Sequence, residues 1–291
     1  HSFPTRRFSD LSRWTGIQAL KAVAGIQTQR VTSANVAFGL APRINAAGRM
    51  GEARDALDLL LTEDPTEAYR LAESIEKLNL ERRGVERQMT EEALDRFRTA
   101  DPAPDAIVQW SDTWPVGVIG IVANRLLDTC HRPAFLIAMD GELGRGSARS
   151  KKGFPLPAAL AACDDLLEQY GGHTEAAGFT IHRRNLEAFA ARLNALAQAS
   201  DLDGEPEPYH VDAQVSLEEV DRSFVNWVDR LGPFGCGHPE LLFGGRKLQL
   251  AEDATVVGQH HLRLNFNAGK RTVKGIAFHQ GPRAAEFAAG R

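Results

Sequence analysis

Two short segments combine arginine, serine and glycine in a way that suits phosphate binding. The first, APRINAAGRM (41–50), places Arg43, Asn45 and Arg49 around the small residues Ala46, Ala47 and Gly48. Planar guanidinium groups match phosphate oxygens, and small residues let the backbone approach a ligand closely. The segment therefore predicts a phosphate clamp, although a helix end with two solvated arginines fits it as well.

The second segment is the most basic stretch of the chain. GRGSARSKK (144–152) contains Arg145, Ser147, Arg149 and Ser150, followed by two lysines and interleaved with two glycines. Backbone N–H groups, hydroxyls and cations could converge there on one phosphate. The alternative is a basic hairpin or loop in water.

One histidine follows a glycine pair. In GGHTEAAGF (171–179), His173 comes after Gly171 and Gly172 and before an expected strand. An imidazole free of bulky neighbours could hydrogen-bond a phosphate or a leaving oxygen. A histidine with a structural role in a turn is the other interpretation.

The C-terminal third mixes basic and aromatic side chains. LGPFGCGHPE (231–240) is either a rigid connector or a loop that presents Phe234 to a base. Beyond it, phenylalanines alternate with cations, as a groove for single strands requires: Lys247, Arg263, Phe266, Lys270, Arg271, Lys274 and Phe278. A solvated sheet face has the same composition.

Composition describes an ordinary globular chain. The 291 residues suggest two domains or three small ones, and the net charge of -4 (34 cations, 38 anions) gives no global sign of a polyanionic partner. No apolar run is long enough to cross a membrane. Cys130, Cys163 and Cys236 are too far apart to form a zinc or redox motif, which predicts a reducing, cytoplasmic location.

Hydrophobic periodicity predicts an α/β fold. Asp64, Pro65 and Glu67 mark the start of a helix that runs to about residue 98, with Leu71, Ile75, Leu78, Val85 and Met89 as its apolar seam. After DPAPD (101–105), the pattern predicts strands at 106–110, 133–139, 144–150 and 176–181, and helices at 117–128, 157–169 and 185–199.

The last part of the chain predicts a small antiparallel β-barrel. DGEPEP (203–208) has the composition of a linker. Polar and apolar residues then alternate over four runs: 209–217, 246–253, 261–269 and 271–280.

Taken in order, these motifs resemble the RecJ family of bacterial single-stranded-DNA-specific exonucleases, in the DHH phosphoesterase superfamily. The likeness rests on APRINAAGRM, LNLERR (78–83), WPVGVIGIVANRL (114–126), GRGSARS, GGHTEAAG and GPFGCGHPE. It extends from about Gly16 to Phe278.

The resemblance implies a 5′-to-3′ exonuclease of DNA recombination and repair that uses Mn²⁺ or Mg²⁺ to hydrolyse phosphodiester bonds. It divides the chain into the end of a DHH catalytic domain (12–60), a connecting helix (61–100), an α/β DHH-associated domain (101–200) and a linker with an incomplete OB-fold (201–291). The family's metal ligands include an Asp-His-His signature that this sequence does not contain. We therefore expect this chain to be part of a longer protein, to grip the substrate, and by itself to bind no metal and to be inactive.

The resemblance also implies roles for individual residues, at the positions where this sequence matches the family's motifs. Arg43, Asn45 and Arg49 would contact the nucleic-acid backbone. Ser147, Arg149 and Ser150 would bind the 5′-terminal phosphate, and Gly171, Gly172 and His173 would touch the substrate near the scissile bond. One departure is Pro115, which stands where the family usually has histidine and leaves that histidine's substrate role in doubt. Single-stranded DNA is the implied partner, with a helicase and single-strand-binding protein as further family partners and no membrane.

Two other functions stay open. One is a DHH phosphoesterase acting on short oligonucleotides or nucleoside phosphates, and the other is a noncatalytic single-strand-binding scaffold. The opening HSFPTRRFSDL (1–11) is close to the translation of a common sequencing-adapter oligonucleotide, so we interpret it as an assembly artefact; a native tail is the alternative.

Overall fold

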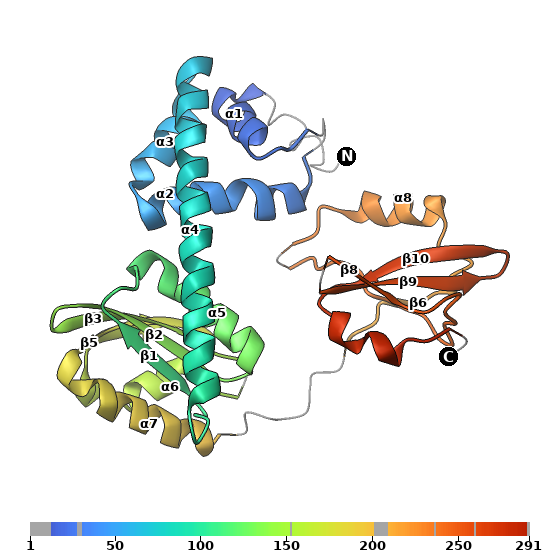
Figure 1. Ribbon diagram of the computed structural model, residues 1–291. Helices are drawn as coiled ribbons and strands as arrows, with labels where there is room; N and C mark the ends of the chain where they lie inside the picture. Colours follow the sequence, from blue (N-terminus) through green and yellow to red (C-terminus); the bar gives the residue numbers. More distant parts are fainter. Residues whose placement is uncertain are drawn as a thin grey trace. The chain divides into compact units, whose positions relative to one another are not determined.

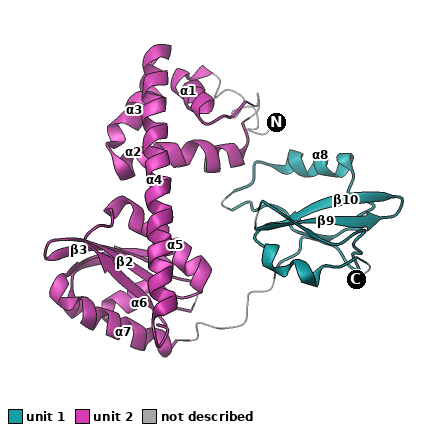
Figure 2. Ribbon diagram, viewed as in Figure 1, with its two compact units in different colours: residues 1–5, 207–291 teal, residues 6–206 magenta. Residues whose placement is uncertain are grey.

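The computed structural model describes residues 13–27, 31–151, 153–200, 209–235, 237–258 and 260–289. The chain forms two compact units, one within residues 6–206 and the other mainly within 207–291 (Figure 2). The adapter-like segment 1–11, the linker 203–208, Lys152 and Cys236 lie outside the described residues.

The first unit begins with helices that pack on a long one. They are α1 (Thr15–Val23), a π-helical turn (Asn35–Leu40), α2 (Ala41–Met50) and α3 (Ala53–Leu61), and all three α-helices pack on α4 (Pro65–Thr99) (Figure 1). At 1.5 Å per residue, the 35 residues of α4 span about 52 Å. The predicted long helix is confirmed.

Two separate cores lie along α4. Leu71 and Ile75 pack with α1, α2 and α3, whereas Met89 and Ala93 pack with α5 (Val116–Cys130) and the sheet. The apolar seam that the sequence predicts therefore ties the helical part to the α/β part within one unit.

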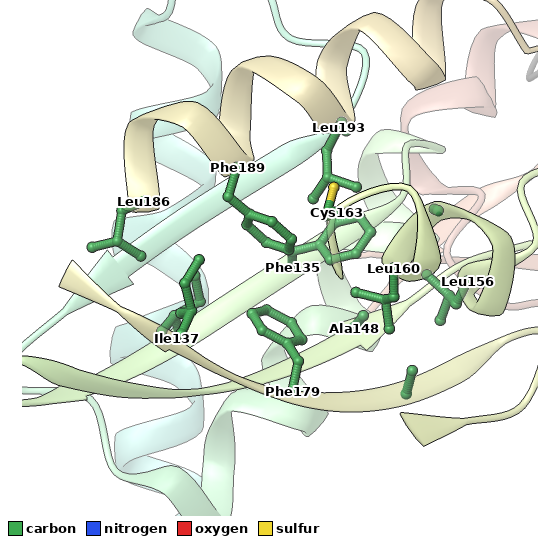
Figure 3. Close-up of a cluster of buried hydrophobic side chains, with 14 of the residues drawn as sticks. Phe135, Ile137, Ala148, Leu156, Leu160, Cys163, Phe179, Leu186, Phe189 and Leu193 are labelled. Carbon is green, nitrogen blue, oxygen red and sulfur yellow. The ribbon is translucent and has the colours of Figure 1, made fainter. Parts of the chain in front are cut away.

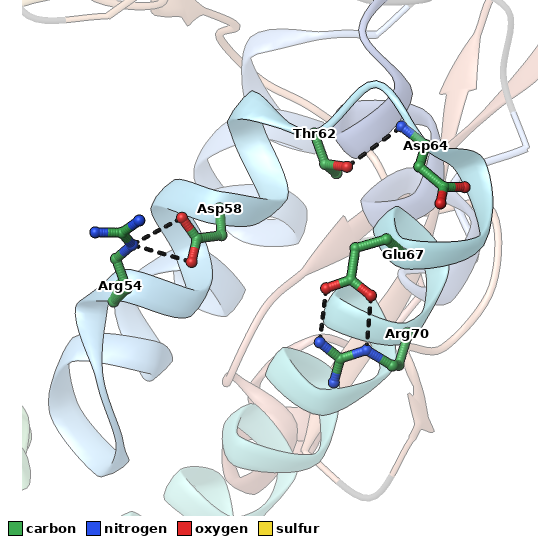
Figure 4. A network of polar contacts seen from close by, with 6 residues as sticks. All are labelled: Arg54, Asp58, Thr62, Asp64, Glu67 and Arg70. Carbon is green, nitrogen blue, oxygen red and sulfur yellow. Dashed lines mark hydrogen bonds and ion pairs between the residues drawn. The ribbon is translucent and has the colours of Figure 1, made fainter.

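The start of α4 follows the predicted signal in part. The side chain of Asp64 accepts a hydrogen bond from the Thr66 amide at 2.9 Å, as an N-cap does. Glu67 does not return to the cap. Its carboxylate instead pairs with Arg70, at 2.7 Å (Figure 4).

A five-stranded mixed sheet forms the centre of the α/β part, in the order β1-β2-β3-β5-β4. β1 and β2 are parallel, and the other pairs are antiparallel. The strands are β1 (Ile107–Ser111), β2 (Ala134–Asp140), β3 (Leu143–Arg149), β4 (Leu167–Gly172) and β5 (Ala176–His182).

Two pairs of helices pack on the two faces of this sheet. α6 (Leu156–Ala161) and α7 (Leu186–Gln198) bury an aromatic core (Figure 3). In this core, the ring centroids of Phe179 and Phe189 are 5.1 Å apart. On the opposite face, α4 and α5 cover β1 and β2. Beyond β3 that face is exposed at Gly171, Ala176 and Gly178.

One predicted helix is wrong in its second half. The sequence favoured a helix over 157–169, but α6 ends at Ala161, and Leu167 opens the edge strand β4. The ladder with β5 satisfies the backbone groups of this segment, so tertiary pairing overrides its helical propensity.

The second unit is a partial OB-fold and not a closed barrel among its described residues. β8 (Thr255–Val257), β9 (His261–Ala268) and β10 (Arg271–Ala277) form an antiparallel sheet, and β6 (Ala213–Gln214) pairs with β7 (Phe243–Gly244). The strands predicted at 261–269 and 271–280 are confirmed. The runs 209–217 and 246–253 contribute only β6 and an isolated bridge at Leu250.

Two further elements of this unit were not predicted. They are α8 (Arg222–Leu231), which Asp221 caps through the Phe224 amide at 2.8 Å, and a 3₁₀ segment, Gly281–Glu286. None of the described helices in either unit has the length and apolar character needed to cross a membrane.

Candidate nucleic-acid interface

The basic segment 144–150 forms strand β3, and its alternation divides its side chains between two faces. Ala148 points into the aromatic core. Arg145, Ser147 and Arg149 therefore share the opposite face, which is the face that α5 partly covers.

Arg149 is held in place beside α5. Its Nη1 donates to Ser147 Oγ at 3.1 Å and to the Ala148 carbonyl at 2.7 Å. A Cβ on Gly120 of α5 would lie 2.9 Å from Ser147 Oγ and 3.0 Å from Arg149 Nη2. Glycine at this position therefore allows α5 to approach both side chains.

Arg49 reaches the same place from the end of α2. Its Nη1 donates to the Gly117 carbonyl at 2.8 Å. A Cβ on Gly117 would lie 2.2 Å from the Arg49 carbonyl oxygen, so the end of α2 can rest against α5 only where there is no side chain. The two glycines of WPVGVIG thus bring Arg49, Ser147 and Arg149 around the first turns of α5.

The two guanidinium groups influence each other electrostatically. Burial, and then the positive charge of Arg49, lowers the pKa of Arg149 below its ordinary value. Arginine nevertheless stays charged in proteins, so the site holds two like charges close together. An anion placed between them would relieve this repulsion.

The start of α5 adds uncapped backbone amides to the site. Pro115 occupies the N-cap position and no side chain caps the helix. Trp114 before it is buried, and its indole N–H donates to Glu92 at 3.2 Å, which fixes the entry into α5. Pro115 therefore shapes the helix start but brings neither a hydrogen-bond donor nor an imidazole to the site.

Arg43 has a partner inside the protein. Its Nη1 donates to the Gly39 carbonyl at 2.7 Å, and its Nη2 donates to Glu76 Oε1 of α4 at 3.0 Å. Its side chain is only 13% exposed. The structure thus gives Arg43 the role of joining α2 to α4 and does not bring it to the Arg149 site.

Asn45 and Arg49 lie one helical turn apart and line a groove between α2 and α3. The groove has a volume of about 530 Å³ and also includes Gly48, Leu57 and Leu60. Asn45 is exposed, so its amide is accessible to a ligand in this groove.

Ser150 uses its hydroxyl inside the protein, and its predicted contact with phosphate stays a prediction. Its side chain is buried, and its hydroxyl donates to the Phe154 carbonyl at 2.7 Å.

The two glycines before His173 differ in whether the fold requires glycine. Gly172 has a φ of 151°, and its Cβ would lie 2.5 Å from the Ala176 carbonyl oxygen, so the turn itself requires glycine. Gly171 has open space above it, with nothing within 4 Å of its Cβ position. His173 is exposed in this turn, and its amide donates to the Ala176 carbonyl at 2.8 Å.

Strand register places the GGH and GSARS motifs side by side. Ser147 faces Gly178 across the sheet, and Gly178 faces Gly171 on the next strand. With strands about 4.8 Å apart, Gly171 and Ser147 lie about 10 Å apart. Sequence reasoning missed Gly117, Gly120 and Gly178, because their importance depends on which elements meet.

In the second unit, one face of β9 and β10 is polar apart from Ile276, and Thr272, Lys274 and Asn267 are exposed on it. Lys274 lies opposite Asn265, and Thr272 lies opposite Asn267. Arg271 is occupied, because its guanidinium donates to three backbone carbonyls, those of Leu217, Glu218 and Val220.

The glycine-rich loop of the second unit is locally stacked. The ring of Phe234 lies 5.2 Å from that of His238, whose Nε2 contacts the Leu231 carbonyl at 3.0 Å. These contacts favour the connector interpretation of this loop.

No group of three or more His, Cys, Asp or Glu side chains in the described parts of the chain could hold a metal ion. The described residues therefore do not fit a Mn²⁺ or Mg²⁺ centre of the kind that the resemblance implies. The site described above consists of cations, a hydroxyl and backbone, a set of groups that suits the binding of anions.

Family models match both parts of the chain. A DHHA1 domain matches residues 104–199 and a RecJ OB domain matches residues 211–291. The first match contains β3, α5 and the GGH turn, and the second contains the polar face of β9 and β10.

Proteins from several bacteria are similar over almost the whole chain. The single-stranded-DNA-specific exonuclease RecJ of Thermus thermophilus is 38% identical over 93% of this chain and 38% of its own length. RecJ of Bacillus subtilis is 33% identical over 91% of this chain and 34% of its own length. A crystal structure of Thermus thermophilus RecJ with Mn²⁺ superimposes with a TM-score of 0.74 at 36% identity, covering 94% of this chain and 40% of that one.

The chain thus spans less than half the length of these relatives. Over that span it has their fold, a DHHA1 domain followed by a RecJ OB domain. Both parts of the chain are therefore similar to the corresponding parts of RecJ proteins.

Proposed function

We propose that this chain grips the backbone and the 5′ end of single-stranded DNA as part of a RecJ-type 5′-to-3′ exonuclease. One observation carries the proposal: Ser147, Arg149 and Arg49 meet around the first turns of α5, with uncapped amides beside them. Two guanidinium groups, a hydroxyl and backbone N–H groups suit a terminal phosphate, which has more negative charge than an internal one.

The residues then have different roles. Arg149 and Ser147 bind the terminal phosphate, and Arg49 adds a second cation. Asn45 lies on the approach along α2. Gly171 keeps the sheet surface flat, and His173 touches the strand near the bond to be cleaved. Contacts of this kind fix the register of a strand without reading its sequence, as a nonspecific nuclease requires.

The proposed activity is the metal-dependent hydrolysis of phosphodiester bonds in recombination and repair. Related RecJ structures have been solved with Mn²⁺ and with Mg²⁺, and this supports one of these ions as the cofactor of the whole protein. Because the described residues do not fit a metal centre, we assign them binding and orientation only.

The second unit favours a strand over a single nucleotide as substrate. Its match to a RecJ OB domain and the exposed side chains of Thr272, Lys274 and Asn267 suit an extended polyanion. A helicase partner, a single-strand-binding-protein partner and a cytoplasmic location stay predictions from the resemblance and the cysteine pattern.

The proposal is tested by the preference for a 5′-phosphate. Fluorescence anisotropy compares the affinity of the chain for a 3′-labelled oligonucleotide that carries either a 5′-phosphate or a 5′-hydroxyl. We expect tighter binding of the phosphorylated strand, and we expect Arg149→Gln to reduce this preference by about tenfold, the effect of one lost charge-assisted hydrogen bond.

Arg184→Gln is the matched control, because Arg184 is exposed on the same unit and lies outside the site. It should keep the preference. An Arg149→Gln variant that discriminates as well as the unchanged chain would refute the role of this site.

A further inference from the structure

A cavity beside the proposed phosphate site contains a cation, Arg145, to which the function described so far gives no role. It has a volume of about 510 Å³ and lies on the open face of β3, β5 and β4, next to the first residue of α5. Its lining includes Val116, Arg145, Gln169, Gly171, Gly178 and Thr180. A volume of this size is typical of sites that hold a small molecule or part of a larger one.

Arg145 provides the positive charge of this cavity. Its side chain is exposed, and it has neither an ion pair nor a hydrogen bond within the described part of the chain. Other arginines of this unit, such as Arg183 and Arg192, have carboxylate partners. Arg145 is therefore a cation that is free to accept an anion from outside.

A fixed polar pair lies next to this cation. Arg145 faces Thr180 directly across the strands, and Gln169 faces Thr180 from the other side. Gln169 Nε2 donates to Thr180 Oγ1 at 3.1 Å, which orients both side chains. The amide oxygen of Gln169 stays available to a ligand.

Two glycines, Gly171 and Gly178, form the floor of the cavity, and packing within the protein does not require glycine at either position. A Cβ on Gly171 would meet nothing within 4 Å, and a Cβ on Gly178 would meet only the Gly146 carbonyl oxygen at 3.8 Å. By contrast, a Cβ on Gly146 would lie 2.1 Å from the ring of Phe179. Packing thus explains Gly146, whereas Gly171 and Gly178 leave room for a group that lies on the sheet.

The cavity is separate from the terminal-phosphate site. Arg149 is pinned to Ser147 Oγ and the Ala148 carbonyl beside Gly120, and it does not line the cavity. Four residues of strand separate Arg145 from Arg149, which is about 13 Å at 3.3 Å per residue. The two arginines can therefore serve different phosphate groups.

We propose that this cavity is a second subsite for the same strand. Arg145 binds a phosphodiester of the nucleic acid whose terminal phosphate lies at Ser147 and Arg149, and the floor formed by Gly171 and Gly178 seats the nucleotide unit between them. This inference rests on the proposed function. It adds a substrate-positioning arginine that discriminates between a strand and a mononucleotide.

Phosphorus NMR separates the two phosphate sites within one ligand. In a 5′-phosphorylated thymidine dinucleotide, the terminal monoester and the internal diester give distinct signals, and the whole chain is titrated into this ligand. We expect both signals to shift with the unchanged chain. Arg145→Gln should abolish most of the diester shift and retain the monoester shift, and it should weaken binding of the dinucleotide by about tenfold.

Control variants keep the result interpretable. Arg145→Lys retains the charge and should restore part of the diester shift, Arg184→Gln should leave both signals unchanged, and circular dichroism checks that each variant folds. Thymidine 5′-monophosphate should bind equally well to the unchanged chain and to Arg145→Gln.

The two proposals fail in different ways. A diester shift that is undiminished in Arg145→Gln, while Arg149→Gln loses the monoester shift, would overturn the subsite and leave the proposed function intact. If Arg149→Gln retains the monoester shift, or if the unchanged chain shifts neither signal, the terminal-phosphate site fails and the subsite fails with it.

Discussion

At the scale of single residues, the structure separates glycines that packing requires from glycines that packing does not require. Gly146 is required by the ring of Phe179, whereas Gly171 has free space where a Cβ would be. The sequence alone cannot separate these cases, because the difference lies in what another strand or helix places opposite each position.

This contrast predicts opposite outcomes for two alanine substitutions. Gly146→Ala should lower the free energy of unfolding by about 1–3 kcal/mol, because the added methyl group overpacks the core. Gly171→Ala should leave stability unchanged or slightly raised and should weaken binding of a 5′-phosphorylated oligonucleotide. Urea denaturation and anisotropy measure the two effects. A Gly171→Ala variant with unchanged affinity would show that the strand does not lie on this part of the sheet.

Cys163 predicts a pH effect at the residue scale. Burial, the largest influence, raises the pKa of this thiol from its ordinary 9.0 to about 11. Between these values the unfolded thiol loses its proton while the folded one keeps it, so the free energy of unfolding should fall as pH rises from about 9 to about 11.

Comparison with Cys163→Ala isolates this effect from the titration of other groups. The variant is less stable overall, and its stability should decline less steeply over the same pH range. Parallel declines for both proteins would contradict the pKa shift of Cys163.

At the scale of elements, helix α4 determines how the two ends of its unit are connected, and its start depends on Asp64. Asp64→Ala should lower the free energy of unfolding by about 1 kcal/mol, because the Thr66 amide loses its acceptor. Glu67→Gln is the control, since Glu67 forms a surface ion pair with exposed Arg70 and should matter less. Equal losses in thermal denaturation would contradict the assignment of Asp64 as the cap.

Elements with strong local signals were predictable. The seam of α4, the buried run of β2 and the alternation in β9 and β10 each mark one structure over many residues. β4 was missed because it gains its bonds from β5. α8 was missed although Phe224, Val228 and Leu231 have helical spacing in the sequence.

The candidate site was predictable in its residues but not in its grouping. Ser147 and Arg149 occur in one motif, and period-2 alternation would have added Arg145 to them. Nothing in the sequence shows that Glu76 pairs with Arg43, or that Gly117 brings Arg49 to the site. Those facts depend on contacts between elements that are distant along the chain.

At the scale of the whole molecule, the proposed grip does not depend on the net charge, because it uses a local group of arginines. The net charge is -4, yet Arg49, Arg145 and Arg149 surround the start of α5 and the neighbouring cavity. Binding through such phosphate contacts should weaken steeply with salt, with a slope near -0.7 per contact for single strands.

The most direct test of a phosphate grip at this site follows the backbone amides of the isotopically labelled chain by NMR during titration with a 5′-phosphorylated oligonucleotide. We expect saturable shifts at Gly117, Gly120, Ser147 and Arg149, and we expect smaller shifts at these amides when the 5′-phosphate is absent. Amides that do not respond at these four positions, while the oligonucleotide binds elsewhere on the chain, would contradict the account.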